Sequence, residues 1–192
     1  MPHYYTLGKI PHKRHTQFRK PDGGLYAEQL FSTEGFSNDS SLLYHIHPPT
    51  QLIQADFQQD VSPEIAEEKM LKHRSLEGFN ILPSADFLES RKPVLVNNDC
   101  HIVLAAPQKS MTNYFYKNTG ADELLFVHEG TGMLKTMYGD FSFSYVDYLL
   151  IPRGTIYQIH FNNSNNRLLI VESFSPIRYP KKYLSKNGQL LE

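Results

Sequence analysis

The feature that most constrains this chain is the even spacing of short strand-like runs between residues 94 and 174. Runs rich in β-branched and aromatic residues recur about every ten residues and are separated by turn-forming residues, a pattern typical of antiparallel sandwiches and barrels. We therefore predict an all-β fold for this region. The predicted strands cover residues 94–97, 101–106, 113–117, 123–128, 133–138, 141–145, 148–151, 156–161 and 167–174.

The first 92 residues have a different pattern of residue types. Residues 1–24 contain interleaved basic residues and histidines and end in the turn sequence Pro21-Asp22-Gly23-Gly24, so we expect an irregular arm there. Strand-like runs follow at 25–31, 42–47 and 52–57, which predict a small sheet. Residues 62–73 predict one surface helix, because Ser62 can cap it, Pro63 suits its first turn, and its charges complement the helix dipole.

Composition excludes several classes of protein. The 192-residue chain has nineteen Lys plus Arg against twenty Asp plus Glu, so no global field favours nucleic acid or an anionic membrane. No stretch is apolar enough to predict a membrane span or a signal peptide. The single cysteine, Cys100, excludes an internal disulfide framework and suits a reducing compartment. We therefore expect a cytoplasmic protein with neither nucleic-acid nor membrane partners.

Two pairs of residues carry the pattern of a known fold. Glu123 and Gly130 are spaced as Glu-x6-Gly, and Pro152 and Gly154 follow as Pro-x-Gly. The spacing resembles the two linked motifs of the cupins, in which the glycines and the proline shape turns between strands. The resemblance implies a cupin-type jelly-roll barrel.

The positions where cupins place metal ligands are altered in this sequence. Counting back from Glu123, the two histidine slots of the first motif fall on Tyr116 and Asn118, or on Lys117 and Thr119 with the shorter spacing. In the second motif the histidine slot is Tyr157, the asparagine slot is Phe161 and the leading glycine slot is Val146. A divalent metal requires several imidazole or carboxylate groups, and Glu123 alone cannot supply them. We therefore predict no metal, cofactor or catalytic residue in this barrel.

Several segments resemble homogentisate 1,2-dioxygenases. Residues 25–30 and 43–49 are similar to the N-terminal region of that family, and residues 123–132, 151–154 and 167–174 resemble its central barrel. The resemblance implies an enzyme with two barrels, of which the first is metal-free and the second binds one Fe(II). It also implies ring opening of homogentisate to maleylacetoacetate, a step of tyrosine and phenylalanine catabolism, in a trimer-based homo-oligomer. A related aromatic substrate remains open, because the N-terminal segment departs from the family pattern.

These observations predict a division of the chain into three parts. Residues 1–92 form an arm with short strands and a helix, residues 93–178 form a degenerate cupin barrel, and residues 179–192 form a linker toward a C-terminal catalytic domain that binds the Fe(II). The chain by itself is then an inactive fragment of a ring-cleaving dioxygenase, whose partners are that domain and neighbouring subunits. The alternative is a freestanding, metal-free cupin module that binds a small aromatic or sugar-like molecule. Its stacking walls would be Tyr114, Tyr116, Phe143, Tyr145 and Tyr157.

Histidines provide the remaining candidates for a site. His45 and His47 share a face of a predicted strand and could bind a metal as a pair, although no third ligand is evident. His101, His128 and His160 lie on predicted barrel strands and could form a different metal site. Structural or surface roles are more common for such histidines.

Overall fold

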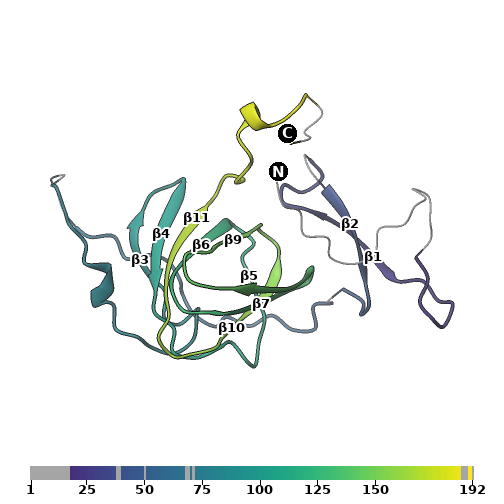
Figure 1. Ribbon diagram of the computed structural model, residues 1–192, viewed down its shortest axis with the longest axis horizontal. Coiled ribbons are helices and arrows are strands. Elements are labelled where there is room, and N and C mark those ends of the chain that lie inside the picture. The colour runs from purple at the N-terminus through teal and green to yellow at the C-terminus, as the bar shows by residue number, and fades with distance from the viewer. Residues whose placement is uncertain are drawn as a thin grey trace. The chain divides into compact units, whose positions relative to one another are not determined.

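The computed structural model describes residues 18–37, 40–49, 51–67, 70, 72–186 and 190–191, and this part is all-β apart from two short 3-10 turns, η1 (Gly78–Asn80) and η2 (Lys181–Tyr183) (Figure 1). The chain divides into two compact units, residues 1–61 and 62–192. The all-β prediction is confirmed. In the described part, no helix has the length and apolar character required to cross a lipid bilayer.

The first unit is built around one antiparallel hairpin. Strand β1 (Ala27–Ser32) pairs with β2 (Ser40–His45), in a register that runs from Ala27 opposite His45 to Ser32 opposite Ser40. The two segments that resemble the N-terminal region of homogentisate dioxygenases therefore contribute to one hairpin. Residues 52–57 form no strand, and Ile53 and Phe57 are exposed, so the prediction of a third strand is wrong.

The second unit contains two antiparallel sheets. The five-stranded sheet has the order β3-β4-β11-β6-β9, and the four-stranded sheet has the order β5-β10-β7-β8. The strands are β3 (Lys92–Val96), β4 (Cys100–Ala105), β5 (Tyr116–Lys117), β6 (Asp122–Glu129), β7 (Gly132–Thr136), β8 (Gly139–Phe143), β9 (Tyr148–Ile151), β10 (Ile156–Phe161) and β11 (Arg167–Ser173). Each of the predicted strands between residues 94 and 174 is found.

The inner faces of the two sheets share one hydrophobic core. Alternate residues on each strand point into it, as the two-residue period of a strand requires. Its members include Val103, Leu125, Val127, Leu168 and Ile170 from the five-stranded sheet and Leu134, Phe143, Tyr157 and Ile159 from the four-stranded sheet. The described strands form two separate sheets, not one closed hydrogen-bonded ring, so the expected barrel is observed here as a two-sheet sandwich.

The turns of the cupin motifs keep the backbone that those motifs require. Gly130 has a φ of +113°, and a Cβ there would lie 2.2 Å from Oδ1 of Asn166, so only glycine fits. Gly154 has a φ of +82°. Val146, in the leading glycine slot of the second motif, also has a positive φ, +64°. The conformation of that turn is retained although its glycine is not.

The prediction of a surface helix at residues 62–73 is wrong for the residues that the structure describes in this stretch, 62–67, 70, 72 and 73. The capping and charge pattern is present, but a helix of about twelve residues is marginal in water unless one face packs against the protein. Ile65 and Met70, the apolar residues that would provide this face, are 69% and 70% exposed. Local propensity therefore has no tertiary contact to support it.

Candidate functional site

The positions that correspond to cupin metal ligands come together inside the sandwich. Tyr157 on β10 is fully buried, and its hydroxyl donates a hydrogen bond to Oε2 of Glu123 on β6 at 2.7 Å. The ring of Tyr116 on β5 packs edge-on against that of Tyr157, with centroids 5.4 Å apart. Asn118, directly after β5, donates from Nδ2 to Oε1 of Glu172 at 3.1 Å. The spacing of the motifs therefore identified a real spatial cluster.

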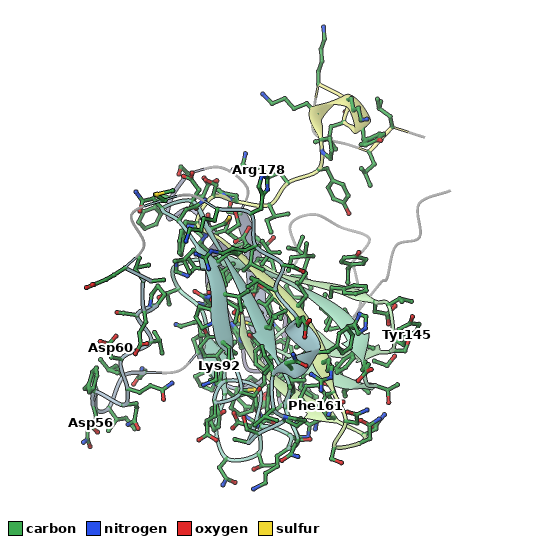
Figure 2. The ribbon with its side chains drawn as sticks, turned by 90° about the vertical axis from the view of Figure 1, so that its left-hand side faces the viewer. Asp56, Asp60, Lys92, Tyr145, Phe161 and Arg178 are labelled. Carbon is green, nitrogen blue, oxygen red and sulfur yellow. The ribbon has the colours of Figure 1, made fainter. Side chains whose placement is uncertain are left out.

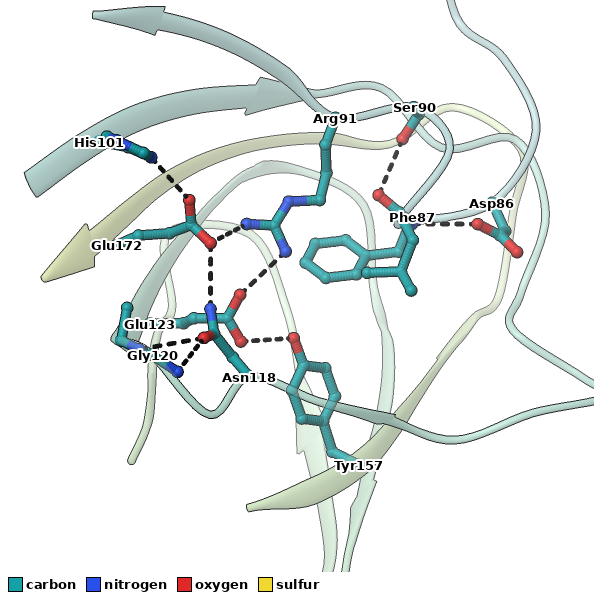
Figure 3. Close-up of polar contacts among 12 residues, drawn as sticks. Asp86, Phe87, Ser90, Arg91, His101, Asn118, Gly120, Glu123, Tyr157 and Glu172 are labelled. Atoms are coloured by element: carbon teal, nitrogen blue, oxygen red, sulfur yellow. Dashed lines mark hydrogen bonds and ion pairs between the residues drawn. The ribbon is translucent and has the colours of Figure 1, made fainter. Parts of the chain in front are cut away.

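The centre of this cluster is the guanidinium of Arg91 (Figure 3). Its Nη1 donates to Oε1 of Glu123 at 2.9 Å, and its Nη2 donates to Oε1 of Glu172 at 2.5 Å. The Arg91 side chain is 12% exposed and that of Glu123 is fully buried. The guanidinium also lies 5.4 Å from the ring centroid of Phe87 and 5.9 Å from that of Tyr116, within range of cation–π attraction. We call Arg91, Glu123, Glu172, Tyr157, Tyr116 and Asn118 the arginine cluster.

A tight turn before β3 positions Arg91. The Asp86 carboxylate accepts the backbone N–H of Leu88 at 3.0 Å, and the N–H of Ser90 donates to the Asp86 carbonyl at 3.0 Å. Phe87, in the same turn, is fully buried and anchors it in the core. The turn therefore delivers Arg91 to the inner side of the sandwich, immediately before the chain enters β3.

The charges in the cluster depend on one another. Burial opposes the charge of Arg91, but the carboxylates of Glu123 and Glu172 outweigh it and raise the pKa of Arg91 above its ordinary value. Burial raises the pKa of Glu123, whereas Arg91 and the Tyr157 hydroxyl act to lower it. A buried carboxylate is costly unless it is paired and hydrogen-bonded. Here both oxygens of Glu123 have a donor.

The tyrosines stay protonated at neutral pH. Burial raises the pKa of Tyr157 well above 10.0, and the nearby Glu123 adds to that effect. Burial likewise raises the pKa of Tyr116 to about 12. Both phenols can therefore donate hydrogen bonds but cannot serve as anionic ligands near neutral pH.

A divalent metal does not fit this donor set. The two carboxylates that could bind one are engaged by a permanently charged guanidinium, and the three histidine slots of the cupin motifs hold two phenols and an amide. Metal ions of this type prefer imidazole, carboxylate or thiolate ligands. Among the residues that the structure describes, no group of three or more His, Cys, Asp and Glu side chains is placed to hold a metal ion.

Comparison with known protein families matches residues 6–182 to the model described as homogentisate 1,2-dioxygenase N-terminal. The chain belongs to the homogentisate 1,2-dioxygenase N-terminal family. The resemblance seen in the sequence is thereby confirmed, and the arginine cluster is the interior of a member of that family.

A curated relative agrees with this assignment at a coarser level. A protein of Saccharolobus solfataricus named "Putative dioxygenase" is 34% identical over 189 residues, which cover 98% of this chain and 48% of that protein. The chain therefore spans about half the length of this curated relative.

The solved structures that are similar to this chain include two cupins. A cupin-2 domain protein of Shewanella frigidimarina has a TM-score of 0.43 and 16% identity, covering 50% of this chain and 89% of that one. A cupin superfamily protein of Desulfitobacterium hafniense has a TM-score of 0.45 and 14% identity, covering 56% and 97%.

The candidate histidines of this dioxygenase-family chain lie apart from the cluster or at its margin. Nδ1 of His101 lies 3.6 Å from Oε2 of Glu172, whereas His128 packs edge-on against Phe79 with ring centroids 4.7 Å apart. Nε2 of His160 lies 2.5 Å from Oε1 of Gln158.

The first hairpin places its histidines differently. Nε2 of His45 lies 2.8 Å from Oε1 of Gln29, and His47 follows the strand in an exposed position. The side chain of His45 is therefore engaged with its neighbouring strand.

Sequence reasoning missed the two residues that complete the cluster. Arg91 is part of Ser90-Arg91-Lys92-Pro93, which resembles an exposed basic turn, so nothing local marks it as buried. Glu172 could have been found from the sequence. It follows the core residues Leu168 and Ile170 at intervals of two, so all three side chains share the inner face of the strand.

Proposed function

We propose that this chain is the non-catalytic half of a homogentisate 1,2-dioxygenase or a close relative. The observation that carries the proposal is the guanidinium of Arg91, which lies where the cupin motifs would place a metal and engages the carboxylates of Glu123 and Glu172. An interior neutralised by the chain's own cation has neither the ligands nor the charge to hold iron. Family membership and a relative of about twice the length support a second, iron-binding half.

In the proposed whole enzyme, Fe(II) would be bound by the other half, where it would allow O2 to react with the aromatic ring of homogentisate and open it to maleylacetoacetate. No step of that reaction is assigned to residues of this chain. Its role is to support the catalytic half and to contribute to assembly with neighbouring subunits, which we propose to be trimer-based. The protein would act in the cytoplasm, in tyrosine and phenylalanine catabolism.

The alternative, a small-molecule module with aromatic walls, has weaker support. Of its candidate walls, Tyr157 and Phe143 are buried in the core, whereas Tyr145 is 61% exposed. Tyr114 is 37% exposed, and its hydroxyl donates to Oδ2 of Asp86. These four rings are therefore divided between the core and the exposed surface.

Metal content and oxygen consumption test the proposal together. The purified chain is incubated with Fe(II), desalted and analysed for iron, and oxygen uptake is then followed with homogentisate. We expect no stoichiometric iron and no uptake. Stoichiometric iron that is lost on substitution of His128 or His160 would contradict the proposal.

The gene supplies a further test. We expect the reading frame beyond codon 192 to encode a second cupin segment with two histidines and a glutamate, and a stop codon at that point would contradict the proposal.

A further inference from the structure

The chain that leaves the last strand is fastened to the sandwich by side chains. Strand β11 ends at Ser173, and residues 174–178, all of which the structure describes, belong to no strand. Figure 2 labels Arg178 on this segment, beyond the end of the strands and before η2. A segment outside the sheet ladders opens easily unless other groups bind its backbone. We call residues 174–178 the exit segment.

The carboxylate of Asp122, the first residue of β6, binds the exit segment. Asp122 is 3% exposed, and its Oδ2 accepts the backbone N–H of Ile177 at 2.7 Å. Its Oδ1 accepts the backbone N–H of Arg153 at 3.0 Å and lies 3.4 Å from Nε of the same residue. Both oxygens of this buried carboxylate therefore have N–H donors, as burial of a charge requires.

Arg153 binds the exit segment at a second point. It lies between Pro152 and Gly154 of the second cupin motif, so the motif turn presents both its backbone N–H and its side chain to Asp122. Its Nη2 donates to the carbonyl of Phe174 at 2.9 Å. A guanidinium can bridge two acceptors in this way because its donors form a rigid, planar fork. We call Asp122 and Arg153 the exit clamp.

The long sequence separation of these contacts distinguishes the exit clamp from an ordinary turn. Ile177 and Arg153 are 55 and 31 residues from Asp122. Asp147, by contrast, accepts the N–H of Ser144, only three residues away, at 2.7 Å. A carboxylate that binds its own turn stabilises local backbone, whereas Asp122 fixes one segment of the fold to another.

The exit clamp adjoins the arginine cluster. Asp122 directly precedes Glu123 on β6, and Phe174 lies two residues after Glu172 of β11. His101 connects the two regions, because its Nδ1 lies 3.6 Å from Oε2 of Glu172 and its ring packs edge-on against that of Phe174, with centroids 4.9 Å apart. The cluster that fills the emptied metal site therefore also supports the strand ends from which the exit segment leaves.

We propose that the exit clamp fixes the direction in which the chain leaves this half and thereby holds the second half in one orientation. This inference rests on the two-half enzyme proposed above. The family model that matches this chain describes an N-terminal part, so the link to the second half would begin at the exit segment. A link that is fastened as far as Ile177 leaves less free chain over which the halves can reorient. Asp122 and Arg153 are positioning residues in this proposal.

Hydrogen exchange of the 192-residue chain, followed by NMR, tests the clamp itself. Asp122→Asn preserves the shape of the side chain but replaces one acceptor oxygen with an N–H donor. The protection of the Ile177 amide, relative to that of the core amide of Ile170, should fall at least about 10-fold. Arg153→Met, which leaves Asp122 intact, should lower the same ratio by a smaller factor. Asp147→Asn is the matched control and should leave the ratio unchanged.

Spin labels on the whole protein test the orientation of its halves. One label is placed on Ser142→Cys, an exposed position of β8, in a chain that carries Cys100→Ser, and the other on a surface cysteine of the second half. Dilution with unlabelled protein removes distances between subunits. Asp122→Asn and Arg153→Met should broaden the distance distribution about two-fold or more, because the freed link lets the halves reorient. Asp147→Asn should leave it narrow.

Two results would overturn this proposal. One is an Ile177 amide that is equally protected in Asp122→Asn and in the unsubstituted chain. The other is a distance distribution that Asp122→Asn leaves unchanged in the whole protein. A reading frame that stops at codon 192 would contradict the proposed function, whereas a second half that keeps one orientation without the clamp would contradict only the role of the clamp.

Discussion

The two faces of the five-stranded sheet contrast in an unexpected direction. On β6, Glu123 points inward into the arginine cluster, while its neighbour Leu124 points outward. On β11, Glu172 and Val171 repeat the arrangement. On these two strands a carboxylate therefore lies on the inner side, beside the hydrophobic core, while its sequence neighbour on the opposite face is a hydrocarbon side chain. A buried charge is costly unless it is compensated, and the inner charges find their partners within the chain.

Removal of the inner cation should have the largest effect. Arg91→Met leaves Glu123 buried without its opposite charge, and loss of one member of a buried pair costs about 3–5 kcal/mol of unfolding free energy. Urea unfolding measures this value. Arg167→Met is the matched control, because Arg167 also lies beside a carboxylate and an aromatic ring, but its carboxylate partner Glu129 is more exposed. This substitution should lower the unfolding free energy by less than about 1 kcal/mol. Equal losses would remove the contrast between the faces.

A second substitution should partly repair the first. In Arg91→Met, changing Glu123→Gln removes the unpaired buried carboxylate and leaves an amide that can still bond to Tyr157. The double variant should therefore be more stable than Arg91→Met alone by about 1–3 kcal/mol, as expected for residues in direct contact. The same denaturant series measures this coupling. Simple additivity would show that Arg91 does not act through Glu123.

The pH dependence of Tyr157→Phe sharpens the description of the inner face. At pH 8 the loss of a buried hydroxyl that donates to Glu123 should cost about 1–3 kcal/mol. Burial raises the pKa of Tyr157 well above 10.0 in the folded chain. As the pH rises past 10, the Tyr157 phenol therefore ionises in the unfolded chain before it ionises in the folded chain. The unfolding free energy of the unsubstituted protein then falls by up to about 1.4 kcal/mol per pH unit because of this group. The difference in unfolding free energy between the unsubstituted chain and Tyr157→Phe should therefore become smaller above pH 10.

Exposed Tyr179 provides the control for this experiment. Tyr179→Phe removes a phenol that is 67% exposed, so its unfolding free energy should stay parallel to that of the unsubstituted chain over the same pH range. A gap for Tyr157→Phe that stays constant above pH 10 would contradict the account of the buried phenol.

Substitution on the outer face should have the smallest effect on folding. Leu150→Lys, at a position that is 47% exposed, should change the unfolding free energy of the monomer by no more than about 0.5 kcal/mol, as is usual for surface positions. Urea denaturation measures this change. A loss comparable to that of Arg91→Met would mean that the outer face contributes to the fold of the single chain.

Sequence alone determined the strands of the second unit, several of its turns and the location of the site. The two-residue alternation and the turn residues fix where strands run, because both are local properties of the backbone. The motif spacing correctly placed Tyr116, Asn118, Glu123 and Tyr157 in one cluster. The leading glycine slot, which the motif spacing assigned to Val146, has a positive φ in the structure.

Tertiary structure decided what fills that site and which local signals are used. Arg91 is 32 residues from Glu123 in the sequence and 81 from Glu172, and only the folded chain brings the three together. The helix predicted at residues 62–73 is absent among its described residues because exposed Ile65 and Met70 have no surface to pack against. Local patterns specify backbone geometry, but charge pairing and burial depend on contacts between distant segments, which the sequence does not display.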